Sequence, residues 1–148
     1  MFLDVYLKDF NEGSPEYKLL SIFSYGTWSD YLSFESSCPK ELKLEPNSEA
    51  ARKLKKLTLL SLGAKESCIQ FAKIKKELSI DNVADLESLV IDLMASNYID
   101  AKIDEQTSCI ICDRAVSRCV KNDEESIKRI IQEIKNFRDK ISNALKVQ

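Results

Sequence analysis

The sequence has no histidine among its 148 residues. This absence excludes the Ser-His-Asp and Cys-His nucleophile systems, the HExxH zinc proteases and the usual histidine-ligated zinc hydrolases, because each needs an imidazole as base or ligand. The sequence also lacks a glycine-rich phosphate loop. The acidic run Asp123-Glu-Glu at a predicted helix start suits the helix dipole and needs no catalytic role. We therefore expect no enzyme, no cofactor, no metal and no small-molecule substrate.

Glycine and proline are scarce, with three residues of each, so helices should dominate. No apolar run approaches the roughly 20 residues of a membrane span, and the apolar start has no basic flank of the kind that a secretory signal carries. The formal net charge of −2 argues against bulk binding to nucleic acid or anionic membranes. Five cysteines, an odd number in a chain without an export signal, indicate reduced thiols.

Residues 1–64 are predicted to form a short helical segment. Pro15 occupies a first helical position and Gly26 follows an apolar run, which predicts a helix between them. Thr27 with Asp30 three residues later resembles a capping box that opens a second helix. The expected apolar face of this second helix is Trp28, Tyr31 and Leu32.

Residues 36–47 are polar, contain two prolines and are predicted to be a loop. Ser48 suits the N-cap of a third helix that runs to about Leu62 and ends near Gly63. Its predicted face consists of Ala50, Leu54, Leu57 and either Leu60 or Ser61.

The block from Cys68 to Cys112 has the order helix, short turn, helix and two strands, which is the order of a winged helix. Asn82 and Asp85 are expected to cap the second helix. The predicted helix faces are Phe71, Ile74 and Leu78 in the first and Val83, Leu86, Val90 and Leu93 or Met94 in the second. Alternating residues at 98–104 and the returning run at 108–112 predict a small antiparallel sheet of two or three strands.

The second helix of this block is acidic. Between Glu77 and Ala101 the sequence has six acidic residues and no basic one. A helix that contacts phosphates and base edges needs positive charge. We therefore expect the winged helix, assigned to residues 65–120, to bind protein rather than DNA. The basic residues at 52–56 and 73–76 leave a weaker case for RNA contact, although the exposed face of an amphipathic helix explains them better.

Cys109 and Cys112 have the spacing of a zinc or redox motif. A single pair without histidine is a weak signal, and Cys119 would supply only one further ligand. A redox pair usually opens a helix, whereas this pair lies on a predicted strand. Buried structural cysteines are therefore the favoured interpretation.

Residues 121–148 are predicted to form one long helix that opens at Asn122 or Asp123. Its apolar residues recur in steps of three and four and form a narrow stripe. The stripe consists of Ile127, Ile130, Ile131, Ile134, Phe137, Ile141 and Leu145. Packing onto the same chain and packing into a bundle of helices from other subunits are equally consistent with this pattern.

Four segments resemble the PCI domain family and, within it, the subunit-seven family of the COP-nine signalosome. Leu20–Tyr31 is similar to the IFAYGTYxDY stretch of that family, and Lys53–Leu62 to its KLRxLTIVSL helix. Leu86–Asp92 resembles LEDLIIEA, and Ala101–Asp104 resembles the GKLD of the wing. Subunits of translation initiation factor three and of the proteasome lid share much of this pattern.

The resemblance implies a mainly α fold, with a short helical-repeat segment followed by a winged helix, a small antiparallel sheet and a long C-terminal helix. It implies a non-catalytic scaffold subunit of the cytoplasm and nucleus, whose partners are other PCI-domain subunits. The charge and the short apolar runs described above argue against nucleic acid and exclude a membrane as partners. Edge-to-edge pairing of the wing, through the strand at 108–112 or the strand at 99–103, and a shared helical bundle are the expected contacts. The expected contact residues are Ile99, Ala101, Ile103, Cys109, Ile111, Ile127, Ile130, Ile134, Phe137 and Ile141.

Overall fold

The computed structural model describes residues 13–118 and 123–146. The expectations for Cys119, Asn122 and the apolar start of the chain lie outside these residues. In chain order, the elements are α2 (Pro15–Tyr25), α3 (Trp28–Glu35), the 3₁₀ turn η1 (Lys40–Leu42), α4 (Glu49–Lys65), β1 (Cys68–Gln70), α5 (Phe71–Leu78), α6 (Val83–Ala95), β2 (Ile99–Asp104), β3 (Cys109–Ala115) and α7 (Glu124–Lys146). The mainly α fold class and the small antiparallel sheet are confirmed.

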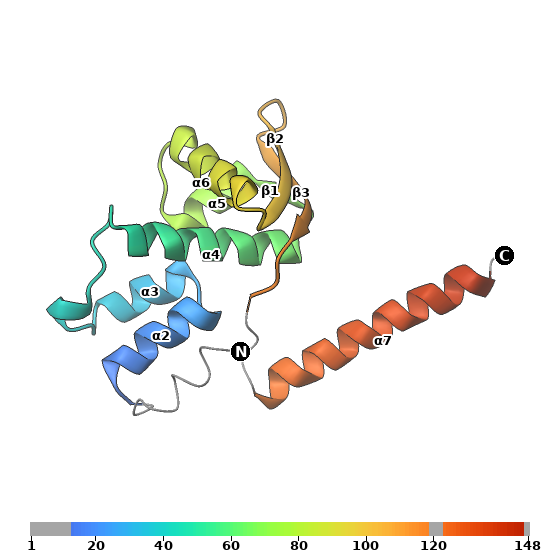
Figure 1. Ribbon diagram of the computed structural model, residues 1–148, viewed down its shortest axis with the longest axis horizontal. Coiled ribbons are helices and arrows are strands. Elements are labelled where there is room, and N and C mark those ends of the chain that lie inside the picture. The colour runs from blue at the N-terminus through green and yellow to red at the C-terminus, as the bar shows by residue number, and fades with distance from the viewer. Residues whose placement is uncertain (1–12, 119–122, 147–148) are drawn as a thin grey trace.

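Helix α4 crosses the centre of the molecule, with α2 and α3 on one side and α5, α6 and the sheet on the other (Figure 1). It contributes Leu54, Leu59 and Leu60 to the core, and all three are buried. The opposing winged helix contributes Ile74, Leu86 and other apolar residues to the same core. One continuous core therefore joins the N-terminal helices to the winged helix.

The predicted helix starts in the N-terminal part are confirmed. Ser14 caps α2, with the Tyr17 backbone N–H donating to its Oγ, and Pro15 follows as the first helical residue. Thr27 and Asp30 form a reciprocal capping box at the start of α3. The prediction for Leu32 is wrong, since this side chain is 41% exposed while Trp28 and Tyr31 are buried.

Two features of α4 differ from prediction. Ala51 and Thr58 are buried where Ala50 and Leu57 were expected, while Leu54 and Leu60 are buried as predicted. The helix also continues through Gly63 to Lys65. A Cβ atom added at Gly63 would lie 3.1 Å from Cys112 Sγ and 3.2 Å from Ile99 Cδ1, so this glycine allows α4 to approach the sheet closely.

The sheet has three antiparallel strands in the order β1-β3-β2. Residues 68–70, predicted as the start of a helix, form β1 instead, with Ile69 opposite Ile110 of β3. On the other side, β3 pairs with β2, and Ile103 lies opposite Ile110. Because β3 is central, the backbone of residues 108–112 is not a free edge, which corrects the expectation that this strand could accept a partner.

Helix α6 starts as predicted, with the Asp85 backbone N–H donating to Asn82 Oδ1 at 2.7 Å. Its buried residues are Leu86, Leu89, Val90 and Leu93. Val83, expected on the apolar face, is 36% exposed, and of the alternatives Leu93 and Met94 it is Leu93 that is buried. Leu89 was missed, because the buried stripe is shifted round the helix toward this residue and away from Val83.

Candidate protein-interaction surfaces

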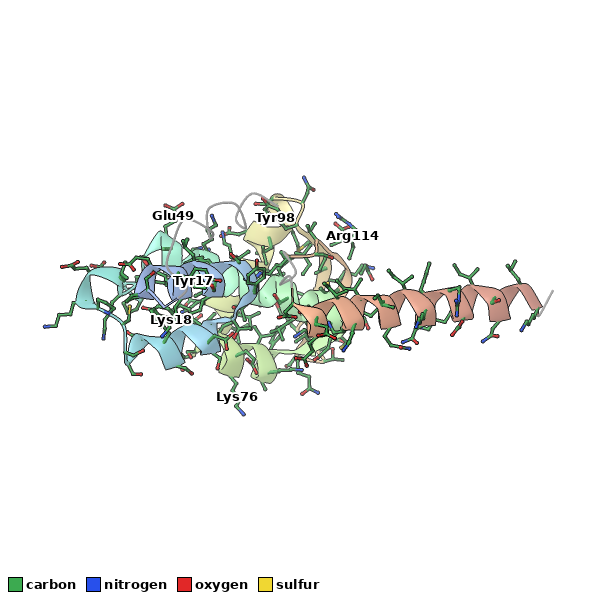
Figure 2. All side chains as sticks on the ribbon, turned by 90° about the horizontal axis from the view of Figure 1, so that it is seen from below. Tyr17, Lys18, Glu49, Lys76, Tyr98 and Arg114 are labelled. Atoms are coloured by element: carbon green, nitrogen blue, oxygen red, sulfur yellow. The ribbon has the colours of Figure 1, made fainter. Side chains whose placement is uncertain are left out.

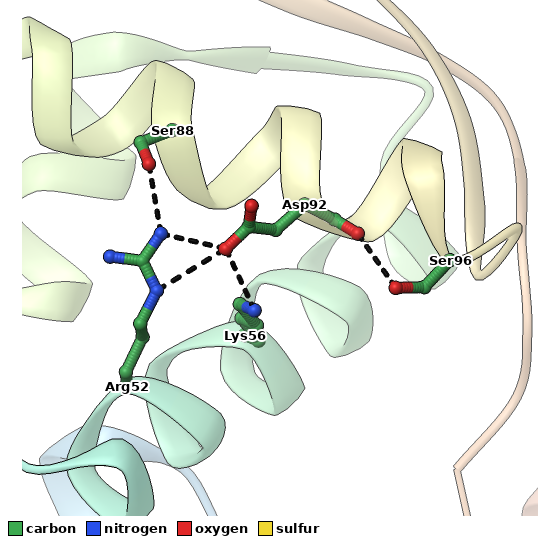
Figure 3. Close-up of polar contacts among 5 residues, drawn as sticks. All are labelled: Arg52, Lys56, Ser88, Asp92 and Ser96. Carbon is green, nitrogen blue, oxygen red and sulfur yellow. Dashed lines mark hydrogen bonds and ion pairs between the residues drawn. The ribbon is translucent and has the colours of Figure 1, made fainter.

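The acidic residue Asp92 of α6 binds the basic face of α4 (Figure 3). Its Oδ2 atom lies 2.7 Å from Arg52 Nη2 and 2.8 Å from Lys56 Nζ. Arg52 also donates to Ser88 Oγ at 2.8 Å. Hydrogen bonds from Lys56 and then Arg52 lower the pKa of the Asp92 carboxyl below its ordinary value. The basic residues at 52–56 and 73–76 are called here the basic ridge. Two of them, Arg52 and Lys56, therefore stabilise the packing of α6 on α4.

Other bases of the ridge also have partners within the chain. Lys55 Nζ lies 4.7 Å from the ring centroid of Trp28, and burial lowers the pKa of its ammonium group. Lys73 forms an ion pair with Glu66. Lys75 Nζ donates to the backbone carbonyl of Asp81 at 2.9 Å. A surface that binds nucleic acid needs unpaired bases directed outward, and these contacts weaken the RNA hypothesis.

Helix α7 projects away from the body formed by the other elements (Figure 1). None of its described residues is buried, and most of its length extends beyond the body when viewed from below (Figure 2). The large apolar residues along its stripe are 45% to 67% exposed, namely Ile127, Ile131, Ile134, Phe137, Ile141 and Leu145. Ile130 is half-buried. The sequence left two hypotheses for this helix, packing onto the same chain and packing into a bundle with other subunits. The structure does not show the first.

The wing residues predicted as contacts divide into two groups. The side chains of Ile99, Ala101 and Cys109 are buried in the core of this chain. Ile103 is half-buried, and Ile111 is 38% exposed on the outer face of the sheet. A partner at the outer edge of β2 would therefore meet backbone groups and the side chain of Ile103, whereas Ile111 lies on the central strand β3, opposite Lys102.

The cysteines of the predicted Cys-x-x-Cys pair are both buried and unbonded to each other. Cys109 contacts the Thr107 hydroxyl at 3.0 Å. Burial raises the pKa of the Cys112 thiol, which disfavours the reactive thiolate. Within residues 13–118 and 123–146, no group of three or more histidine, cysteine or acidic residues could hold a metal.

Arg118 makes a contact that the sequence did not indicate. Its guanidinium donates to the carbonyl oxygens of Gly26 at 2.6 Å and Phe23 at 2.8 Å, at the C-terminal end of α2. It also donates to Ser61 Oγ of α4 at 3.0 Å. A cation is favourable beside the last carbonyls of a helix, and α2 has no basic residue in its own last turn. No local pattern could reveal a contact between residues 92 positions apart.

None of the helices in the described part of the chain combines the length and apolar character of a membrane span. The chain is a winged-helix protein, as its core, the helix α6 and the three-stranded sheet show. The winged helix lies in the sequence between an N-terminal group of helices and a projecting C-terminal helix.

Comparison with known proteins specifies the class. The family model described as PCI domain matches residues 44–114. COP9 signalosome complex subunit 7a of Pongo abelii is 30% identical over 118 residues, which are 79% of this chain and 41% of that protein. COP9 signalosome complex subunit 7 of Drosophila melanogaster is 31% identical over 143 residues, 96% of this chain and 49% of that protein. The chain is a PCI-domain protein and is similar to these two proteins.

A more distant relative is eukaryotic translation initiation factor 3 subunit M of Dictyostelium discoideum. It is 25% identical over 136 residues, which are 90% of this chain and 33% of that protein. The chain spans less than half the length of each of the three relatives.

Proposed function

We propose that this chain is a non-catalytic scaffold subunit of a COP9 signalosome, with other PCI-domain subunits as its partners in the cytoplasm and nucleus. In this role, α7 enters a bundle with helices of neighbouring subunits, and the wing pairs through β2 with the winged helix of a neighbour. The similarity to subunit 7 proteins supports the choice of complex.

The exposed stripe of α7 is the observation that carries the proposal. Phe137 and Ile134 are 65% and 62% exposed. Full burial of one such side chain is worth about 1.5–3 kcal/mol, so a stripe of six is a strong driving force for association. Ion pairs such as Lys128 with Glu124 at 2.6 Å lie among the charged residues of the helix. Apolar residues at steps of three and four with charged flanks suit packing between helices.

The free edge of β2 supports the second contact. The described strands have the order β1-β3-β2, so the outer side of β2 has no neighbouring strand within the described chain. An exposed strand edge presents unpaired N–H and C=O groups to a partner strand. Strand β2 has six residues and β1 only three, which makes β2 the better edge for pairing.

Co-purification tests the bundle. A tagged chain with Ile134→Asp and Phe137→Asp should recover far less of the partner subunits than the wild type, because two charges would be buried in the bundle. Gln132→Asp, on an exposed position of the same helix, is the matched control and should keep recovery near the wild-type level. Undiminished recovery by the double variant would refute the bundle.

A second candidate is a PCI subunit of translation initiation factor 3, which the similarity to subunit M favours. Mass spectrometry of the native complex distinguishes the two proposals. Recovery of signalosome subunits supports the first, and recovery of initiation-factor subunits supports the second. Recovery of proteasome-lid subunits would contradict both, although the lid also contains PCI domains of the kind that the sequence resembles.

A further inference from the structure

A groove of about 690 Å³ lies between α6 and the tip of the wing. Its apolar lining, the groove floor, consists of Ile91, Ile103 and Ile111. Ile91 is 56% exposed in the middle of α6, although its neighbour Val90 is fully buried. Ile111 is on the central strand, where the outer face of the sheet leaves it uncovered. Apolar side chains that reach solvent within one groove, here the exposed Ile91 and Ile111 and the half-buried Ile103, are typical of a site that binds another apolar group.

Three acidic residues, one basic residue and the neutral Gln106 complete the lining. The acidic rim consists of Glu87, Asp104 and Glu105, and the base is Lys102. Among the ion pairs of the described residues, none includes Glu87 or Glu105. Hydrogen bonds from Thr107 lower the pKa of Asp104, which keeps this carboxylate ionised. The groove is therefore negative at neutral pH.

This negative charge is separate from the acids that stabilise the fold. Asp92 is bound by Arg52 and Lys56, and Asp100 is bound by Arg114 at 2.7 Å. Those carboxylates are already compensated. The rim carboxylates Glu87 and Glu105 lack such a cation among the described residues, so they are available to a positively charged ligand. Nucleic acid is a poor candidate, because its phosphates would be repelled.

We propose that the groove binds an extended segment of a partner protein, in which a large apolar side chain contacts the groove floor and flanking lysines or arginines face the acidic rim. The extended conformation follows from β2, which lines the groove with Lys102, Ile103 and Asp104 and has a free outer edge. This binding site adds to the proposed role of the wing. It rests on the proposed function only for the identity of the protein that supplies the segment.

A peptide titration of the ¹⁵N-labelled full chain tests this site. The probe is an acetylated peptide of alternating arginine and leucine, and its control has glutamate in place of arginine. The basic peptide should shift the backbone amide signals of residues 87–91 and 99–105, with an affinity that falls as salt rises. The acidic peptide should not bind, since it has the same apolar side chains but the opposite charge.

Matched variants locate the binding. Glu87→Lys should weaken the affinity about threefold or more, the effect of losing and reversing one exposed ion pair. Ile91→Ser should weaken it about fivefold through lost apolar contact. Glu41→Lys and Met94→Ser, at exposed positions outside the groove, should leave it within about twofold. Because all four side chains reach solvent, thermal unfolding should show that each variant folds.

Three results would overturn the proposal: equal binding of the acidic peptide, shifts confined to residues outside the groove, or unchanged affinity in both groove variants. If the same shifts appear without peptide as protein concentration rises, the occupant is a second copy of this chain, and the proposal of a partner segment falls. Binding at the groove by a chain that recovers no sister subunits would leave this site in place and refute the scaffold function alone.

Discussion

Asp92 Oδ2 lies 2.7 Å from Arg52 Nη2, and this ion pair joins the acidic helix α6 to the basic helix α4. The two residues are 40 positions apart in the sequence. Charges that look like two separate surface features in the sequence are thus partners in one packing contact. Asp92 on α6 neutralises Arg52 and Lys56 on α4. This pairing accounts for one of the acidic residues that distinguish this winged helix from a DNA-binding one.

The Asp92 contact should make stability depend on pH. Because Lys56 and Arg52 lower the pKa of Asp92 in the folded state, the carboxylate stabilises the fold above its unfolded pKa of about 4, and this contribution is lost as pH falls through the lower folded pKa. Asp92→Asn should therefore destabilise the chain at pH 7 and much less at acidic pH. Urea unfolding at both pH values measures the difference. Glu41→Gln is the control, and an equal effect of Asp92→Asn at both pH values would contradict the expectation.

Thr58 should be a stabilising buried hydroxyl. Its Oγ1 accepts a hydrogen bond from the Trp28 backbone N–H at 2.8 Å and donates to the Leu54 carbonyl at 2.9 Å. Thr58→Val keeps the shape but leaves the first N–H of α3 without its acceptor, so the free energy of unfolding should fall by about 1–3 kcal/mol.

Chemical denaturation checks the Thr58 prediction, with Ser33→Ala as control. Ser33 is exposed and bonds only to its own helix, so its loss should cost less than about 0.5 kcal/mol. Equal effects of the two substitutions would show that the hydroxyl of Thr58 has no special role.

Replacing Gly63 by alanine should not give the gain in stability that this substitution usually brings within a helix. Glycine in a helix normally costs about 1 kcal/mol relative to alanine. Here a Cβ would crowd Cys112 Sγ and Ile99 Cδ1 at 3.1 and 3.2 Å. Gly63→Ala should destabilise the chain, and the loss should be partly recovered in Gly63→Ala with Cys112→Ala. A double-mutant cycle should give a coupling of about 0.5 kcal/mol or more, whereas additive effects would show that the sheet yields without cost.

Arg118 should stabilise the end of α2. Arg118→Gln removes charged hydrogen bonds to the Gly26 and Phe23 carbonyls and should lower the free energy of unfolding by about 2 kcal/mol. Arg118→Lys should restore only part of this, because an ammonium group lacks the planar fork of a guanidinium.

Hydrogen exchange gives the local measurement for Arg118. Amides in the last turn of α2 should exchange faster in Arg118→Gln, while those in α6 should not change. Arg114→Gln, which loses one exposed ion pair with Asp100, should leave α2 unaffected. Unchanged exchange in α2 would show that Arg118 does not act as its cap.

Local signals predicted most of the helix starts. Pro15 begins α2, and Thr27, Ser48 and Asn82 act as N-caps, because such signals depend on residues within one turn of the helix. Helix ends and burial were less predictable. Gly63 looked like a terminator, but its role is set by Cys112, which is almost 50 residues away in the chain.

The candidate contact residues divide in the same way. The stripe on α7 follows from periodicity alone and is exposed as a stripe. For the wing, the alternation of Ile99, Ala101 and Ile103 was correct, but the sequence left open which of the two strands is the edge, and the structure makes it the strand at 99–104. Strand β1 is only three residues long and has no clear alternation, so its pairing with β3 could not be read from the chain.

The sequence alone determined the helix caps, the order of the winged helix, the apolar stripe of α7 and the lack of a histidine for catalysis. These depend on residue types and on spacings within a few turns. Tertiary structure alone decided the central place of β3, the pairing of Asp92 with Arg52, the contact of Arg118 with α2 and the acidic groove beside β2. Each of these depends on packing between segments distant in the chain, which no local pattern records.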